Sequence, residues 1–121
     1  MTNFREFTTK RGTKILAGKS AENNEDVVKQ VAPDEIVLHT ALPGSPFVNI
    51  KGKPKFGDLK TASLMCARYS QDWRDNKNDV LVHMFKGKDV YKTKGMKTGT
   101  FGIKKFKVIK VKRKLVEGFK V

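Results

Sequence analysis

The stretch DEIVLHTALPGSPFVNI, residues 34–50, holds the clearest fold signal in this chain. Two short, mostly apolar runs, residues 35–40 and 47–51, flank a turn in which Pro43 and Gly44 favour type II geometry. The pattern predicts two strands with an ordinary turn between them. His39 lies in the first strand without a nearby Cys or a second His at ligand spacing. A hydrogen-bonded strand histidine is therefore favoured over a metal ligand or a catalytic base.

Working outward, the residue patterns predict a hairpin before this stretch, a helix on each side of it, and three strands after the second helix. Gly12 is expected to supply a positive φ in the hairpin turn, and Ser20 and Asp58 are expected to cap the helices. The expected strands are residues 4–8, 13–17, 35–40, 47–51, 79–85, 90–92 and 101–112, and the expected helices are residues 21–31 and 59–69. The apolar parity of the last strand shifts twice, which suggests β-bulges near Lys104 and Val108. Residues 70–79 are expected to form a loop.

This ββαββαβββ order predicts a single α+β domain, residues 1–121, with two main helices and a mixed or mainly antiparallel sheet. The start of the chain lacks the apolar core of a signal peptide, and no run approaches the ~18 apolar residues of a membrane span. We therefore expect a soluble, cytoplasmic protein with no membrane partner. The single cysteine, Cys66, excludes an internal disulfide and fits a closely packed helix face. No metal or cofactor is expected, and the oligomeric state stays open.

Positive charge is concentrated at the end of the chain. The whole sequence has 26 Lys and Arg against 12 Asp and Glu, a formal net charge of +14. Residues 90–121 contain 11 of these basic residues and one acid, Glu117. Solvated lysines that protect an edge strand are one explanation. Because the imbalance is so one-sided, a phosphate-binding surface is favoured, and the prevalence of Lys over Arg points to backbone contacts rather than base reading.

The AGKS stretch, residues 17–20, invites comparison with a nucleotide-binding P-loop. That motif needs a glycine at position 13, where this chain has Thr13, so a nucleoside-triphosphatase is excluded. Gly18 and Lys19 nevertheless lead into a helix N-terminus, where free amides favour an anion, and Asn23 and Asn24 lie in its first turn. Phosphate binding and simple capping by Ser20 are equally supported.

The expected loop at residues 70–79 contains Trp73 next to Arg74. A tryptophan in a loop can stack on a base or fill the edge of the core, and both alternatives stay open. The carboxylates of this segment have no recognisable acid–base partner, and His83 is an ordinary strand residue by default. No catalytic residue is predicted.

The order of short motifs resembles the NFACT-R domain, the RNA-binding module of NFACT proteins, which act in ribosome quality control. The resemblance covers roughly residues 15–110. It consists of ILAGKSAENN at residues 15–24, VLHTALPGS at residues 37–45, TASLMCARYS at residues 61–70 and DVYKTKG at residues 89–95. Ser20 stands where the family usually has Asn, and Pro46 where many members have His. The resemblance implies an RNA-binding domain, which also occurs as a small free-standing protein, and implies roles for Lys92 and Lys94.

We therefore expect a protein that binds structured RNA, transfer or ribosomal, through lysine contacts to phosphates and a second patch at the first helix and the Pro-Gly turn. The expected RNA-binding residues are Lys14, Gly18, Lys19, Asn23, Asn24, His39, Gly44, Ser45, Ser70, Trp73, Arg74, Lys92, Lys94, Lys97, Lys104, Lys105 and Lys107. Two alternatives stay open. One is a transfer-RNA modification enzyme or factor that uses the His39 and Ser70 region. The other is an assembly protein that docks on the ribosome through its sheet edge.

Overall fold

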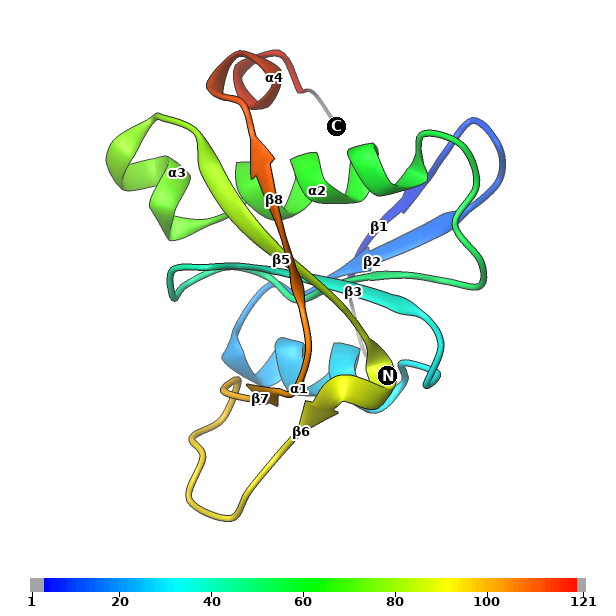
Figure 1. The fold of residues 1–121 in the computed structure, drawn as a ribbon, viewed down its shortest axis with the longest axis vertical. Helices are drawn as coiled ribbons and strands as arrows, with labels where there is room; N and C mark the ends of the chain where they lie inside the picture. Colours follow the sequence, from blue (N-terminus) through cyan, green and yellow to red (C-terminus); the bar gives the residue numbers. More distant parts are fainter. Residues whose placement is uncertain (1–3, 120–121) are drawn as a thin grey trace.

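The computed structural model describes residues 4–119, and its largest element is an antiparallel sheet of six strands (Figure 1). Their order across the sheet is β1-β2-β4-β3-β5-β8, and every neighbouring pair is antiparallel. A separate antiparallel pair, β6 with β7, completes the described strands. The strands are β1 (Arg5–Thr8), β2 (Lys14–Ala17), β3 (Ile36–Thr40), β4 (Val48–Ile50), β5 (Val80–Lys86), β6 (Val90–Tyr91), β7 (Gly102–Ile103) and β8 (Lys107–Val111). The predicted α+β class is confirmed.

Helices cover both faces of the large sheet. In Figure 1, α2, α3 and α4 lie above the sheet, and α1 lies below it with the β6–β7 pair. The helices are α1 (Ala21–Lys29), α2 (Asp58–Arg68), α3 (Gln71–Asn76) and α4 (Arg113–Gly118), with a short 3₁₀ turn at Gly87–Asp89. Each face has its own apolar core, the larger under α2 and the smaller around Val27, Val37, Phe47 and Phe85 under α1. Within residues 4–119, no helix is both long and apolar enough to cross a membrane.

The two strands of the opening stretch form as expected, and they lie at the centre of the sheet. β3 pairs with β4, with Leu38 opposite Val48, and the turn between them holds Gly44 at a φ of 88°. A positive φ at this position is what a Pro-Gly type II turn requires. The predicted positive φ of Gly12 is also found, at 86°. The turn is anchored from outside the sheet, because the Gln71 amide at the start of α3 donates to the Gly44 carbonyl oxygen at 2.7 Å.

The two predicted helices form, with small differences at their starts and ends. The Ser20 side chain caps α1 by accepting from the Asn23 amide at 3.1 Å, as predicted. The prediction that Asp58 caps α2 is wrong by one residue, since Gly57 occupies the cap position. The Asp58 carboxylate instead accepts from the Lys55 amide at 2.7 Å and so closes the turn that precedes the helix.

The prediction of a loop at residues 70–79 is wrong, because Gln71–Asn76 form α3. This helix has one apolar residue in its sequence QDWRDN, and a single apolar position carries no helical periodicity. That residue, Trp73, is 5% exposed and belongs to the core under α2. Of the two alternatives for Trp73, the structure supports the core role, so the expectation that it contacts RNA is corrected.

The prediction of one long final strand is also wrong. The chain forms β7, breaks at residues 104–106, and then forms β8, which joins a different sheet. The first expected bulge falls in this break, where the Lys104 amide donates to the Asp89 carbonyl oxygen at 2.8 Å. The second is absent, since β8 pairs with β5 in continuous register from Met84↔Lys107 to Val80↔Val111. Helix α4 was not predicted.

Candidate nucleic-acid interface

A pocket of about 330 Å³ opens where the N-terminus of α1 meets the turn between β3 and β4. Seven residues of its lining were expected in the RNA site: Gly18, Lys19, Asn24, His39, Gly44, Ser45 and Arg74. Folding brings them together from four separate parts of the chain. Six other residues line the pocket, among them Arg5 from β1 and Tyr69 from the end of α2, which were not among the expected RNA-binding residues.

Asn24 joins α1 to the turn. Its side-chain Nδ2 donates to the Ser45 carbonyl oxygen at 3.3 Å, and its Oδ1 accepts from the Phe47 amide at 2.9 Å. Ser45 is equally engaged, since its Oγ accepts from the Thr40 amide at 3.0 Å. Both residues are buried, and their polar groups are used within the fold. Asn24 and Ser45 therefore shape the pocket wall, and their side chains are engaged in hydrogen bonds within the fold.

The first turn of α1 is closed by reciprocal hydrogen bonds. The Asn23 Oδ1 accepts from the Lys19 amide at 2.9 Å, while the Asn23 amide donates to the Ser20 Oγ. Asn23 is therefore also part of the cap. The Lys19 side chain is exposed at the pocket edge, and its ammonium is the group that this segment offers to an anion.

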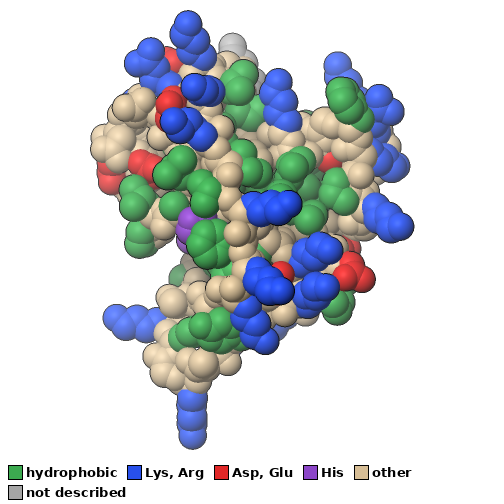
Figure 2. Space-filling view, in the orientation of Figure 1, with side chains coloured by type: hydrophobic (Ala, Val, Ile, Leu, Met, Phe, Trp, Pro, Cys, Tyr) green, Lys and Arg blue, Asp and Glu red, His purple; other side chains and the backbone are tan. Residues whose placement is uncertain are grey.

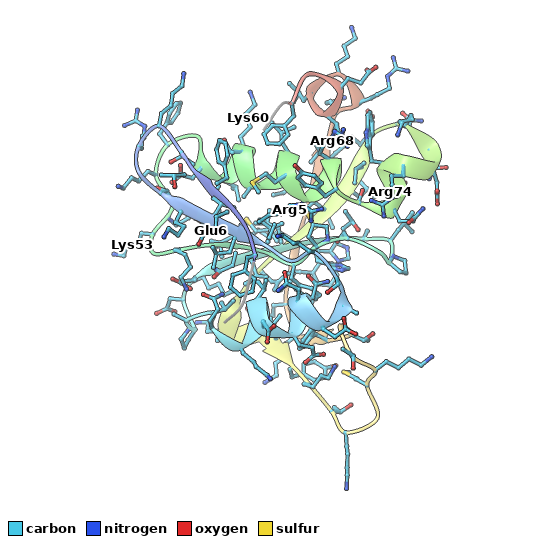
Figure 3. The ribbon with its side chains drawn as sticks, turned by 180° about the vertical axis from the view of Figure 1, so that it is seen from behind. Arg5, Glu6, Lys53, Lys60, Arg68 and Arg74 are labelled. Carbon is cyan, nitrogen blue, oxygen red and sulfur yellow. The ribbon has the colours of Figure 1, made fainter. Side chains whose placement is uncertain are left out.

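Three arginines gather near the junction of α2 and α3, as Figure 3 shows from behind. The Arg5 guanidinium lies 4.2 Å from the centre of the Tyr69 ring and donates to the Gly18 carbonyl oxygen at 3.1 Å. Arg74 donates to the Tyr69 carbonyl oxygen at 3.2 Å, and Arg68 lies 6.0 Å from the same ring. Arg5 and Arg74 both line the pocket. Guanidinium groups can bind phosphate in a bidentate manner, so this corner can hold an RNA backbone.

His39 lies at the pocket with its ring 4.4 Å from that of Phe47. Its Nδ1 is 2.8 Å from the Thr40 carbonyl oxygen, so the N–H of the ring is at Nδ1 in the neutral form. Burial lowers the pKa of His39, and the neighbouring His83 lowers it further. The His39 ring is therefore neutral at pH 7, where it forms part of the pocket wall.

This depressed pKa gives a pH prediction. His39 and His83 both have pKa values below the ordinary 6.5, so the unfolded chain binds more protons than the folded one in this range. Their contribution to stability is present above pH 6.5 and is lost as pH falls through the folded pKa values. Urea unfolding should show stability falling between pH 6.5 and 5, at most about 1.4 kcal/mol per pH unit per histidine.

In the double variant His39→Asn with His83→Asn, the free energy of unfolding should stay constant between pH 6.5 and 5. Its stability should still fall below pH 4.5, because Glu25, Glu35 and Asp58 have lowered pKa values and lose their contribution only as they are protonated. The same slope in both proteins above pH 5 would contradict the assignment to the histidines.

Lys92, one of the expected RNA contacts, has a structural role in the fold. Its Nζ donates to the Glu25 Oε2 at 2.7 Å and to the carbonyl oxygens of Lys97 and Thr100 at 2.6 and 2.8 Å. It also lies 4.6 Å from the centre of the Phe101 ring. Glu25 accepts in addition from the Gly99 amide, so this ion pair holds residues 92–100 against α1.

Replacing Lys92 by methionine should therefore lower the free energy of unfolding by about 1–2 kcal/mol, because one ion pair and two hydrogen bonds to carbonyl oxygens are lost. Lys94→Met is the matched control, because Lys94 is exposed in the same loop and its substitution removes the same charge. Thermal unfolding of both variants at low and high salt measures the difference. Equal melting temperatures would show that the Lys92 contacts do not stabilise the loop.

The remaining expected residues divide into buried and exposed groups. Ser70 is fully buried, where its hydroxyl donates to the Ala67 carbonyl oxygen and accepts from the Trp73 amide, so it caps α3 and is not a surface contact. The exposed group consists of Lys14, Lys94, Lys97, Lys104, Lys105 and Lys107. Lysine and arginine side chains are spread widely over the face in Figure 2. Among residues 4–119, no cluster of three His, Cys, Asp or Glu side chains is arranged to hold a metal ion.

Residues 3–105 match the model of a family described as the NFACT protein RNA binding domain. The chain is 28% identical over 107 residues to the archaeal Rqc2 homolog aRqcH of Methanocaldococcus jannaschii. That match covers 82% of this chain and 16% of the archaeal protein. The fold is similar, with a TM-score of 0.81 and 24% identity, to the C-terminal part of the fibronectin/fibrinogen-binding protein of Streptococcus suis. This structural match covers 98% of this chain and 50% of the streptococcal chain. The chain therefore spans half or less of the length of each of these two relatives.

Proposed function

The chain belongs to the NFACT RNA-binding domain family, and from that premise we propose that it binds structured RNA, transfer or ribosomal, in translation and ribosome quality control. The relationship to an archaeal Rqc2 homolog supports the link to ribosome quality control. The net charge of +14 supports a polyanionic partner.

The pocket is the observation that carries this proposal. Arg5, Lys19 and Arg74 line it beside the N-terminus of α1, where the helix dipole adds to their positive charge. The buried scaffold of Asn24 and Ser45 holds that wall in place without ligand, so little ordering would accompany binding. We propose that the pocket binds one or two phosphates of a folded RNA, while the exposed lysines of residues 94–107 contact the backbone nearby.

A double variant, Lys19→Gln with Arg74→Gln, tests this role of the pocket. Lys10→Gln with Arg11→Gln is the matched control, because it removes the same two types of charge from an exposed turn outside the pocket. Binding to a transfer-RNA transcript should weaken about tenfold or more in the pocket variant and less in the control. Equal losses in the two variants would contradict a specific role for the pocket.

The choice between transfer and ribosomal RNA needs a separate measurement. Crosslinking in cells followed by sequencing of the bound RNA should recover one of these classes well above its abundance. Recovery of RNA fragments in proportion to their abundance would contradict the proposal of a structured target.

A further inference from the structure

One part of the large sheet has no covering helix among residues 4–119. Helix α1 packs on β2 and β4, and the β6–β7 pair packs near Phe85 at one end of β5. The rest of β5 and β8 on this face is left open by the described part of the chain. Leu81 is 42% exposed and Val108 is 56% exposed, although both lie within strands of a folded sheet.

An aromatic pair lies in this open area. Phe106, which directly precedes β8, stacks on the His83 ring with centroids 4.1 Å apart and planes inclined by 25°. Phe106 is 48% exposed, so a large part of its ring faces solvent. His83 lies opposite Val108 in the β5–β8 register. Figure 2 shows a histidine among hydrophobic side chains, with lysine or arginine side chains nearby.

Lysines surround the same area. Lys110 lies opposite Leu81 in the register, and Lys104 and Lys105 come directly before Phe106 in the chain. Lys107 lies opposite Met84 and so belongs to the other face of the sheet, which α2 covers. Lys104, Lys105 and Lys110 are exposed, and residues 90–116 contain no acidic residue. An apolar surface next to these lysines favours a partner that combines flat apolar faces with negative charge.

We propose that this surface, made by Leu81, His83, Phe106, Val108 and Lys110, is a platform on which unpaired bases of single-stranded RNA stack. The bases supply flat apolar faces for Phe106, and the phosphates pair with the surrounding lysines. The proposal rests on the proposed function, because the partner is RNA, but it adds a second class of RNA structure and a second site.

The platform is separate from the pocket and yet connected to it. His83 pairs with His39 across β5 and β3, and His39 lines the pocket. The pocket and the platform therefore share one face of the sheet, so an RNA with an unpaired strand next to a folded part could occupy both. Lysines on the β8 edge also disfavour addition of a strand from another protein.

The test compares Phe106→Ala with Phe56→Ala in the full chain. Phe56 is 87% exposed and lies near Arg11, so its removal deletes a phenylalanine ring that is even more exposed than Phe106 at a distant place on the surface. The probes are a uridine RNA of about ten nucleotides, an abasic oligonucleotide with the same number of phosphates, and an RNA hairpin duplex. Phe106→Ala should weaken binding of the uridine RNA about tenfold to a hundredfold. Its binding to the abasic and duplex probes, and its salt dependence, should match those of the unmodified chain.

A Phe106→Trp variant gives a direct reading of stacking. It should keep its affinity for the uridine RNA and lose fluorescence on binding that probe but not the abasic one. Three outcomes would overturn the platform. The unmodified chain could bind the uridine and abasic probes with equal affinity, or Phe106→Ala and Phe56→Ala could lose the same affinity for the uridine RNA. The third is that the unmodified chain forms a dimer that Phe106→Ala dissociates. If the unmodified chain still binds the duplex probe in these cases, the proposed function stands without the platform. If the unmodified chain binds none of the three probes, both proposals are refuted.

Discussion

Replacing Gly18 by alanine should lower the free energy of unfolding by about 2–4 kcal/mol and remove RNA binding at the pocket. A Cβ at this position would lie 1.9 Å from the Asn24 Oδ1 and 3.0 Å from its Cγ. The Asn24 side chain would have to move, and the hydrogen bonds that it makes to Phe47 and Ser45 would be lost. Because the site is buried, the freed amide and carbonyl groups would have no water to replace these bonds.

Gly95→Ala is the matched control. A Cβ on Gly95 would meet no atom within 4 Å, so its stability should be unchanged within about 0.5 kcal/mol. Urea unfolding measures both variants, and titration of the folded proteins with transfer RNA measures the pocket. A Gly18→Ala variant as stable as Gly95→Ala would mean that α1 can shift away from the turn without loss.

Removing three C-terminal lysines should weaken RNA binding on the order of 100-fold at ~0.1 M salt. The triple variant changes Lys104, Lys105 and Lys107 to Gln. If each lysine neutralises one phosphate, the slope of log affinity against log salt should become less steep by about 2–3 units. All three are exposed, so the folded structure should persist.

A second triple variant separates local charge from total charge. Lys10, Lys53 and Lys60 are also exposed, and their change to Gln lowers the net charge equally; Figure 3 marks Lys53 and Lys60. This control should change the salt slope by less than one unit. Equal slopes for the two triple variants would mean that RNA responds to the total charge of the protein and not to the C-terminal segment.

Local chemistry was sufficient to predict much of the fold. Alternating apolar residues, the Pro43-Gly44 turn and the Ser20 cap depend on neighbours in sequence, and all three are found in the structure. Prediction failed where periodicity was absent or misleading. Helix α3 has one apolar residue, and residues 101–112 show strand-like alternation on both sides of the break at residues 104–106. The change of sheet between β7 and β8 leaves no signal in the local sequence, because it depends on which distant strand each of them pairs with.

For the candidate site, the sequence by itself determined its chemistry: an excess of lysine concentrated after residue 90, a Gly-Lys-Ser helix start, and a Pro-Gly-Ser turn at residues 43–45. Only the tertiary structure decided which of these groups are free to bind. It placed Arg5 and Tyr69 at the pocket, and it engaged Lys92, Asn24 and Ser70 within the fold. The physical reason is that a polar group can bind a ligand only with the donors and acceptors that partners within the fold leave free, and those partners, however distant in sequence, are set by packing.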